Sequence, residues 1–224
     1  MKDERFILSE IPITATFEKA LETLNLSEPE DIELMEGLFA KAKEIARPKV
    51  LFEVAYIDNV DISRNEVVIG DTVFCSPTAS MLLKDIGRVF AYIATCGAEV
   101  DEWSHSQTDY VVSVWLDMIK ALFLYDAINF FKNHLKTIYG LEKISFVNPG
   151  AGNLENWPIR EQKKLFGLLG DVKGDIGVIL TDSFLMLPTK TVSGLAFPTE
   201  KEFHNCDLCN RKNCPGRHNS KRQE

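Results

Sequence analysis

One uninterrupted segment constrains this chain more than any other: residues 108–139 contain no glycine and no proline and are rich in helix-forming side chains. The segment predicts the longest helix of the protein, a scaffold against which a sheet can pack. Its most apolar part, Tyr110 to Phe131, still carries Asp117, Lys120 and Asp126. These charges favour a buried core helix over a bilayer span, so we expect no transmembrane segment.

Polar residues fall on two sides of this helix. At about 100° per residue, one group shares a side and a second group lies roughly opposite. The first group is Asp109, Ser113, Asp117 and Lys120, and the second is Asp126, Asn129, Lys132, Asn133 and Lys136. The middle of the helix is thus expected to be covered nearly all round. Asp126 either begins the second solvent-facing stripe or is partly desolvated and needs a partner.

Helix and strand patterns alternate along the rest of the chain. Helices are predicted over 15–26, 29–46, 79–86 and 158–169, and strands over 51–57, 66–70, 72–75, 88–97, 176–180 and 191–197. This order predicts an α+β fold in which a mixed or antiparallel sheet packs against long helices. It divides the chain into a helical N-terminal segment (1–48), an α+β body (49–203) and a Cys-rich tail (204–224).

Composition and charge exclude several classes of protein. With 45% hydrophobic and 26% charged residues, the 224-residue chain has the balance of a globular protein with a core. Lys plus Arg is 25 against 33 for Asp plus Glu, so no whole-protein basic surface is available for nucleic acid. The N-terminus lacks the apolar segment of a signal peptide. We expect a cytoplasmic protein with free thiols and with neither nucleic-acid nor membrane partners.

The tail carries the one pattern typical of a metal site. Cys206, Cys209 and Cys214 form C-x2-C-x4-C-P, and two thiolates two residues apart can hold one ion from a tight turn. His204 or His218 would complete a Cys3His zinc site, and three cysteines also suit an iron–sulfur cluster. The alternatives are a redox-active Cys pair or an exposed thiol-rich tail.

The remaining cysteines and the tail charges have simpler interpretations. Cys75 and Cys96 lie in apolar strand-like sequence and are predicted to be inert core residues. Five basic residues and one acid follow Asn210, which gives the tail a positive charge. Such a tail either docks an acidic partner or phosphates, or is simply a solvated terminus.

Two loop-rich segments suggest a small-molecule pocket. In the first, Pro-Gly and Gly-Asn steps precede a tryptophan and allow close backbone approach to a ligand. In the second, a strand runs into hydrogen-bonding groups beside apolar ones before the chain returns. The candidate binding residues are Asn148, Pro149, Gly150, Asn153, Trp157, Asp182, Ser183, Phe184 and Met186. The asparagines are also explained as turn-forming residues.

The two segments, in their order and spacing, resemble the C-terminal reactivation domain of cobalamin-dependent methionine synthase and its stand-alone relatives. The likeness spans about residues 50–200, including a Thr-x-Gly strand end at Thr95-Cys96-Gly97 followed by the long helix. Its markers are Pro149-Gly150, Trp157-Pro158, Gln162, Leu165-Phe166, Ile176-Gly177-Val178, Leu180-Thr181, Ser183-Phe184, Met186, Pro188 and Val192-Ser193-Gly194. The family binds S-adenosylmethionine and helps to remethylate oxidised cobalamin, with an electron from a flavodoxin-type donor. The resemblance therefore implies an α+β unit with this ligand and a cobalamin-bearing partner.

Two positions depart from the family pattern. Phe146 stands where the family has an arginine and Ala151 where it has a tyrosine, and both family residues hold S-adenosylmethionine. Losing the arginine removes charge-assisted hydrogen bonds worth about 1.5–3 kcal/mol. Asp182 replaces the family's glutamate and keeps an acceptor of shorter reach.

Three functions follow from these observations. The first is an accessory protein for reductive reactivation of a partner's corrinoid, the partner being a methionine synthase without its own reactivation domain or another corrinoid protein. The second is a metal or iron–sulfur redox module that passes electrons to a corrinoid protein. The third is an adaptor without a small-molecule site. No nucleophile–base pair, zinc-hydrolase motif or phosphate loop is present, so no catalytic residue is assigned.

Overall fold

The computed structural model describes residues 4–24, 26–152, 155–200, 203 and 205. Its centre is a five-stranded antiparallel sheet in the order β1-β2-β6-β10-β7. The strands are β1 (Glu4–Leu8), β2 (Lys49–Tyr56), β6 (Arg88–Thr95), β10 (Thr191–Pro198) and β7 (Ile144–Val147). β2, β6 and β10 are buried on both faces, which explains their nearly continuous apolar sequence.

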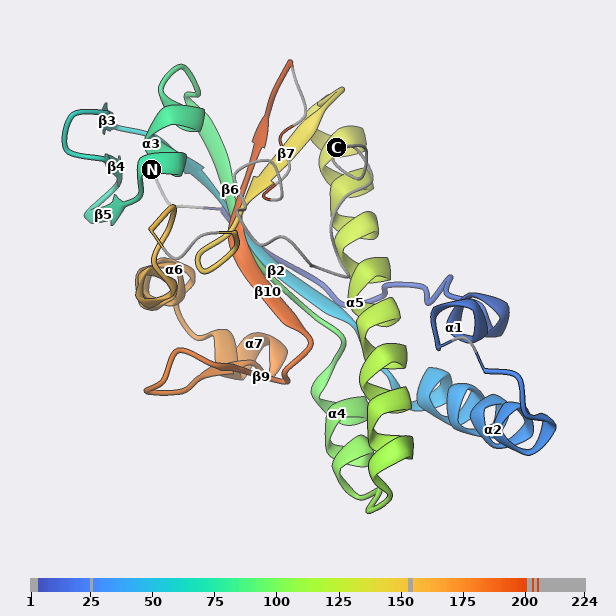
Figure 1. Cartoon of the computed structure of the whole chain (residues 1–224). Helices are drawn as coiled ribbons and strands as arrows, with labels where there is room; N and C mark the ends of the chain where they lie inside the picture. Colours follow the sequence, from blue (N-terminus) through green and yellow to red (C-terminus); the bar gives the residue numbers. More distant parts are fainter. Residues whose placement is uncertain (1–3, 25, 153–154, 201–202, 204, 206–224) are drawn as a thin grey trace, which may run out of the picture.

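Helices cover both faces of this sheet (Figure 1). The long helix α5 (Tyr110–Tyr139) lies along one face, and α6 (Gln162–Leu169) and α7 (Val172–Ile176) lie on the other. The second half of α5 packs on the sheet through Ala127, Phe131 and Leu135. Its first half packs instead against α1 (Phe17–Leu24), α2 (Pro29–Ile45) and α4 (Ala98–His105). The predicted helix 108–139 is therefore confirmed, and α5 is covered on several sides in its middle.

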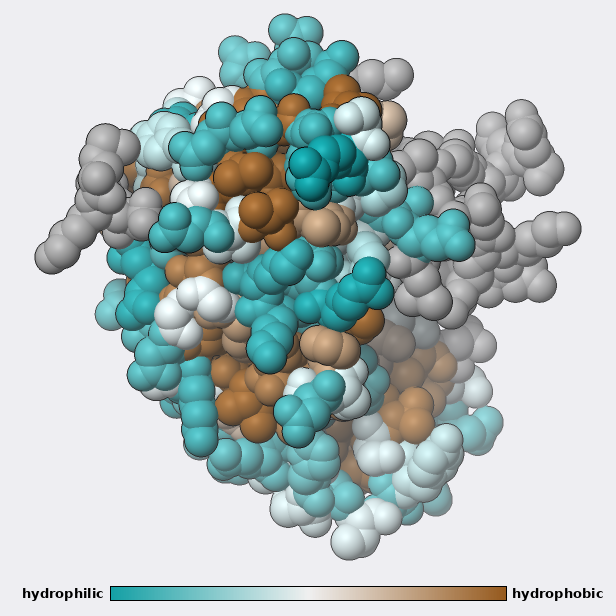
Figure 2. Space-filling model, turned by 90° about the vertical axis from the view of Figure 1, so that its left-hand side faces the viewer, coloured by the Kyte–Doolittle hydropathy of each residue, from teal (hydrophilic) through white to brown (hydrophobic). Residues whose placement is uncertain are grey.

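Two small units complete the fold. β3 (Asn59–Asp61), β4 (Glu66–Ile69) and β5 (Thr72–Cys75) form a separate antiparallel sheet, followed by α3 (Pro77–Leu83). Short strands β8 (Ile179–Leu180) and β9 (Met186–Leu187) form a hairpin, and a 3-10 turn, η1 (Ile159–Glu161), precedes α6. Figure 2 shows the face that carries β3–β5, α6 and α7, where apolar side chains lie in separate patches among hydrophilic ones.

The α+β class and the antiparallel sheet match the prediction, whereas α4, α7, β3, β7 and β9 were not among the predicted elements, and further local features differ. β1 lies in the segment expected to be helical, and it pairs with β2 from Glu4↔Val54 to Leu8↔Val50. The predicted strand 176–180 shrinks to Ile179–Leu180, because α7 extends to Ile176 and Gly177 ends it in a left-handed conformation. Cys75, expected in the core, is exposed, whereas Cys96 is buried as expected.

Asp126 is buried and has partners in the N-terminal segment. Its carboxylate accepts hydrogen bonds from the backbone N–H groups of Thr14 and Ala15, both at 2.9 Å, and from the Thr14 hydroxyl. Of the two interpretations of this residue, the one that requires a partner is confirmed. Among the described helices, none combines the length and the apolarity needed to cross a bilayer.

Candidate functional site

The first predicted loop begins where β7 ends, and Asn148 holds it to the sheet. The Asn148 amide donates to the Tyr92 hydroxyl at 2.7 Å and to the Ser193 carbonyl at 2.8 Å. Its Oδ1 accepts from the Asn205 side chain at 2.8 Å. A Cβ atom at Gly194 would lie 2.4 Å from the Asn148 amide nitrogen, so only glycine fits beside this residue. The polar atoms of Asn148 are therefore used within the chain.

The rest of this loop packs inward. Gly150 has φ 77° and its N–H donates to the Trp157 carbonyl at 2.7 Å. Trp157 is 1% exposed and packs edge-on against Phe74, with ring centroids 5.9 Å apart. Its indole N–H is buried and has no partner among the described residues. Trp157 is thus a core residue, and Asn153 lies outside the described residues.

A crevice beside this loop has no room for a water molecule. Phe203 and Asn205 are among the residues that line it, and the Phe203 N–H donates to the Ser145 hydroxyl at 2.8 Å. Its lining consists of Thr78, Val147, Asn148, Ala151, Asn156, Trp157, Phe203 and Asn205.

Phe146, at the position where the resemblance implies an arginine, belongs to an aromatic cluster. Its ring lies 5.4 Å from that of Tyr92 and 6.3 Å from that of Phe131, measured between centroids. Burial raises the pKa of Tyr92 well above its ordinary value, so its hydroxyl stays protonated and accepts from Asn148 as a neutral group. This position therefore presents an apolar ring in place of a cation.

The second predicted segment is the β8–β9 hairpin and its tip. Asp182 and Ser183 are exposed at the tip. Phe184 has φ 62°, a value that is rare for residues other than glycine and asparagine. Met186 instead packs against the core. The first segment is joined to β10 by the hydrogen bond from Asn148 to the Ser193 carbonyl, and the second segment contacts β10 through β9. Among the described residues, no hydrogen bond joins the two segments directly.

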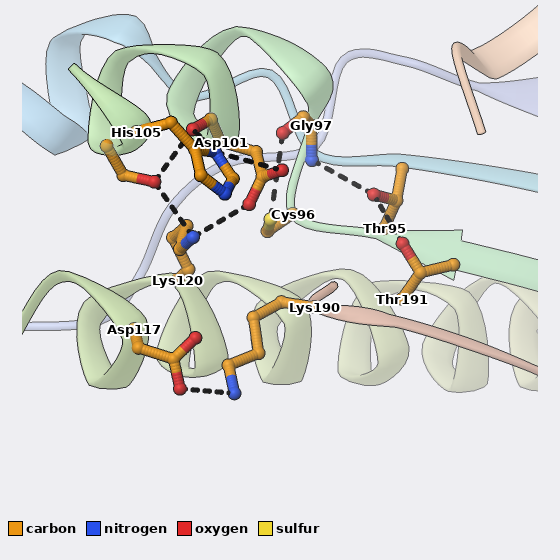
Figure 3. A network of polar contacts seen from close by, with 10 residues as sticks. Thr95, Cys96, Gly97, Asp101, His105, Asp117, Lys120, Lys190 and Thr191 are labelled. Carbon is orange, nitrogen blue, oxygen red and sulfur yellow. Dashed lines mark hydrogen bonds and ion pairs between the residues drawn. The ribbon is translucent and has the colours of Figure 1, made fainter. Parts of the chain in front are cut away.

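A polar network that the sequence analysis did not single out surrounds the Thr95-Cys96-Gly97 strand end (Figure 3). Lys120 of α5 is 5% exposed, and its ammonium donates to Asp101 at 2.7 Å and to Ser104 at 2.9 Å. Lys190 pairs with Asp117 at 2.7 Å and thereby joins the segment before β10 to α5. The first polar group of the helix, Asp109, Ser113, Asp117 and Lys120, is thus partly buried, because α4 covers its Lys120 end.

Cys96 lies within this network as a thiol. Burial and the Asp101 carboxylate raise its pKa to about 12, although Lys120 and Lys190 act in the opposite direction. Because the thiolate is the reactive form, Cys96 is inert at neutral pH. Among the described residues, no three His, Cys, Asp or Glu side chains lie close enough to hold a metal ion. The predicted ligands Cys206, Cys209, Cys214, His204 and His218 lie outside the described residues.

A known structure shares the fold of this chain. No protein-family model and no curated protein sequence matches the chain. A solved structure that does match is the MetH reactivation domain with bound AdoHcy, S-adenosylhomocysteine, at a TM-score of 0.61 and 16% sequence identity. The match covers 92% of this chain and 83% of the other. The chain has the fold of the MetH reactivation domain.

The shared fold confirms the resemblance inferred from the two loop segments, and it adds the N-terminal region to that resemblance. The match spans 92% of the chain, whereas the sequence likeness was limited to about residues 50–200. At 16% identity the match establishes the architecture. Ligands and residue roles depend on the individual sites, which differ between proteins that share a fold.

Proposed function

We propose that this protein is an accessory factor for reductive reactivation of a partner's corrinoid. The observation that carries the proposal is the fold shared with the MetH reactivation domain over 92% of the chain. A corrinoid-bearing protein would be the partner, either a methionine synthase without such a domain or another corrinoid protein. In this role the chain contributes orientation and the exclusion of water.

The β8–β9 hairpin tip suits contact with a partner. Asp182, Ser183 and Leu185 are exposed there, and Leu185 is 53% exposed although it is apolar. The Thr181 side chain bonds both the N–H and the carbonyl of Leu185 at 3.0 Å, which holds the tip in shape without a partner. A preorganised tip with polar and apolar groups costs less conformational entropy on binding.

The Asn148–Trp157 loop fits an S-adenosyl ligand poorly in its described residues. The Asn148 amide, the Gly150 N–H and the Ala151 N–H all donate within the chain. Phe146 offers no charge to a carboxylate. These observations favour a second candidate, an adaptor that binds the corrinoid protein without a nucleotide ligand.

A titration with AdoHcy, the ligand named for the MetH structure, separates the two candidates. Calorimetric binding at micromolar affinity, about −8 kcal/mol, would support ligand-assisted reactivation by this chain. Association with a corrinoid-bearing methionine synthase fragment, without heat from AdoHcy, would support the adaptor.

The accessory role itself is tested on the corrinoid. We expect the protein to accelerate loss of the cob(II)alamin absorption of that fragment in the presence of a reductant and S-adenosylmethionine. Asp182→Asn combined with Ser183→Ala should weaken association, whereas Asp71→Asn on the exposed β4–β5 turn should not. If the folded wild-type protein shows no association and no acceleration, the proposal is refuted.

The redox alternative concerns the tail and is tested by its metal. An iron–sulfur cluster held by Cys206, Cys209 and Cys214 would make an anaerobic preparation brown and allow electron transfer to the corrinoid. Stoichiometric zinc, which has no redox chemistry, would leave the tail a structural or docking role.

A further inference from the structure

A second site lies at the α4–α5 corner, in a cleft of about 450 Å³ that the reactivation proposal does not use. This volume is in the range of small-molecule sites. Its lining comes from Ser104 and His105 of α4, from residues of α5 and from Thr189. The lining is polar apart from Val114.

Lys120 supplies a cation to the lining of this cleft. An ammonium carries three N–H donors, and the contacts with Asp101 and Ser104 use two of them. Taking a Lys–Asp pair out of water is costly unless every polar group is satisfied. Since Lys120 lines the cleft, its third donor can be satisfied by a ligand that enters there.

Asp117 supplies an anion at the rim. It is three residues before Lys120 on α5, so the two Cβ atoms lie about 5–6 Å apart on one face of the helix. Its Oδ2 forms an ion pair with Lys190 Nζ at 2.7 Å, and its side chain is 51% exposed. No hydrogen bond to its Oδ1 is found among the described residues. A cation and an anion thus stand side by side, each with capacity left for one further hydrogen bond.

Apolar residues continue the same helical stripe. Val114 is three residues before Asp117, is 45% exposed and lines the cleft. Val111, one further step along the stripe, is 51% exposed. The order along α5 is therefore cation, anion and apolar surface.

We propose that this cleft binds a free α-amino acid with an apolar side chain. The carboxylate of the amino acid accepts from Lys120, its ammonium shares Asp117 with Lys190, and its side chain lies against Val114. The charges explain why a zwitterion fits better than a simple anion. Lys120 is balanced by Asp101, which also lies 3.7 Å from His105, and Lys190 is balanced by Asp117. A zwitterion leaves the net charge of these pairs unchanged, whereas a singly charged ligand adds a charge to them.

Three probes of equal apolar size test both charged contacts: L-leucine, isocaproate, which lacks the amino group, and isoamylamine, which lacks the carboxylate. Their binding is followed through the backbone amide NMR signals of α4 and the first half of α5. We expect leucine to bind at least about tenfold more tightly than either analogue. Equal affinity for the three probes, or no signal change in this region at millimolar leucine, would overturn the proposal.

Variants assign each preference to its residue. Lys120→Met should abolish the preference of leucine over isoamylamine, and Asp117→Asn should abolish its preference over isocaproate. Because Lys120→Met leaves Asp101 buried without its cation, Lys120→Met with Asp101→Asn is the matched variant for stability. Lys163→Met, exposed on α6, is the control. If leucine affinity is unchanged in both cleft variants, the amino acid binds elsewhere and the proposal is wrong.

Discussion

Asp126 is a single carboxylate that fixes the path of the N-terminal segment across α5. It accepts from the backbone N–H groups of Thr14 and Ala15 and from the Thr14 hydroxyl. Asp126→Ala leaves these donors without a partner, so we predict a loss of about 1.5–3 kcal/mol in the free energy of unfolding. Urea denaturation measures it. Asp71→Ala, at an exposed turn, is the control, and an equal effect of the two would disprove the prediction.

The two described cysteines should react differently. Cys75 is exposed, whereas Cys96 is buried and its pKa is raised to about 12. In a variant with Cys206, Cys209 and Cys214 changed to serine, we predict that only Cys75 reacts with a thiol reagent in the folded protein. Both cysteines should react after unfolding. Mass spectrometry identifies the labelled residue, and rapid labelling of Cys96 in folded protein would contradict the geometry.

His134 should make stability decrease in mild acid. Its ring packs edge-on against Phe52 with centroids 5.6 Å apart, and burial lowers its pKa below the ordinary value of 6.5. His134 therefore binds a proton more readily in the unfolded chain than in the folded chain. As a result, the free energy of unfolding decreases as pH falls through about 6.5. Urea midpoints at about pH 8 and about pH 5.5 should differ less in His134→Gln than in the wild type. A larger difference between the two urea midpoints in the variant than in the wild type would contradict this role of His134.

At the scale of elements, α5 begins at a defined cap. The Asp109 carboxylate accepts from the N–H groups of Val111 and Val112 at 2.8 Å and 3.0 Å. We predict that Asp109→Ala destabilises the protein by about 1 kcal/mol. Asp109→Asn keeps an acceptor and should retain most of that stability. Equal losses in the two variants, measured by urea denaturation, would assign the effect to charge and not to capping.

Elements whose signals are local could be predicted, and those that depend on distant partners could not. The helix predicted over 29–46 is Pro29–Ile45, because proline, acids and apolar spacing lie within the segment itself. β1 was missed because its five residues gain strand structure from β2, more than forty positions later. Arg5 of β1 also donates to the Leu169 carbonyl at 2.8 Å and forms an ion pair with Asp175 at 2.8 Å.

The candidate site also has parts that could be predicted from the sequence and parts that could not. Its two loops were recognisable from glycine, proline and polar residues in a fixed order, and these residues do form loops and a hairpin tip. The partners of Asn148 come from Tyr92, Ser193 and Asn205, so its internal use could not be inferred from its own neighbourhood. Lys120 was visible as a charge in an apolar run, but its burial depends on α4.

At the scale of the whole molecule, α5 joins two cores. Its first half packs with α1, α2 and α4, and its second half packs on the sheet that carries the predicted loops. The amino-acid cleft lies on the first half and the Phe146 cluster on the second. One continuous helix therefore contacts both the cleft and the Phe146 cluster.

The body and the tail should behave as separate units. The three hydrophobic cores are built from elements that end by Pro198, with Phe203 packed against one of them. Metal binding by Cys206, Cys209, Cys214 and His218 would supply ordering energy to the tail alone, which has few apolar residues. We therefore predict that a chain ending at Asn205 keeps the unfolding free energy of the full chain within about 0.5 kcal/mol and loses its metal.

Elemental analysis and urea denaturation of the same preparations check this prediction. The full chain with Cys206→Ser is the matched variant, because it keeps the tail and removes one ligand. It should lose metal as the shortened chain does, and a chelator should leave the urea midpoint of the wild type unchanged. Metal that remains bound after the tail is removed would place the ligands in the body. A chelator that lowers the midpoint would instead show that the tail stabilises the sheet, since a metal-ordered segment adds its binding energy only to the structure that it contacts.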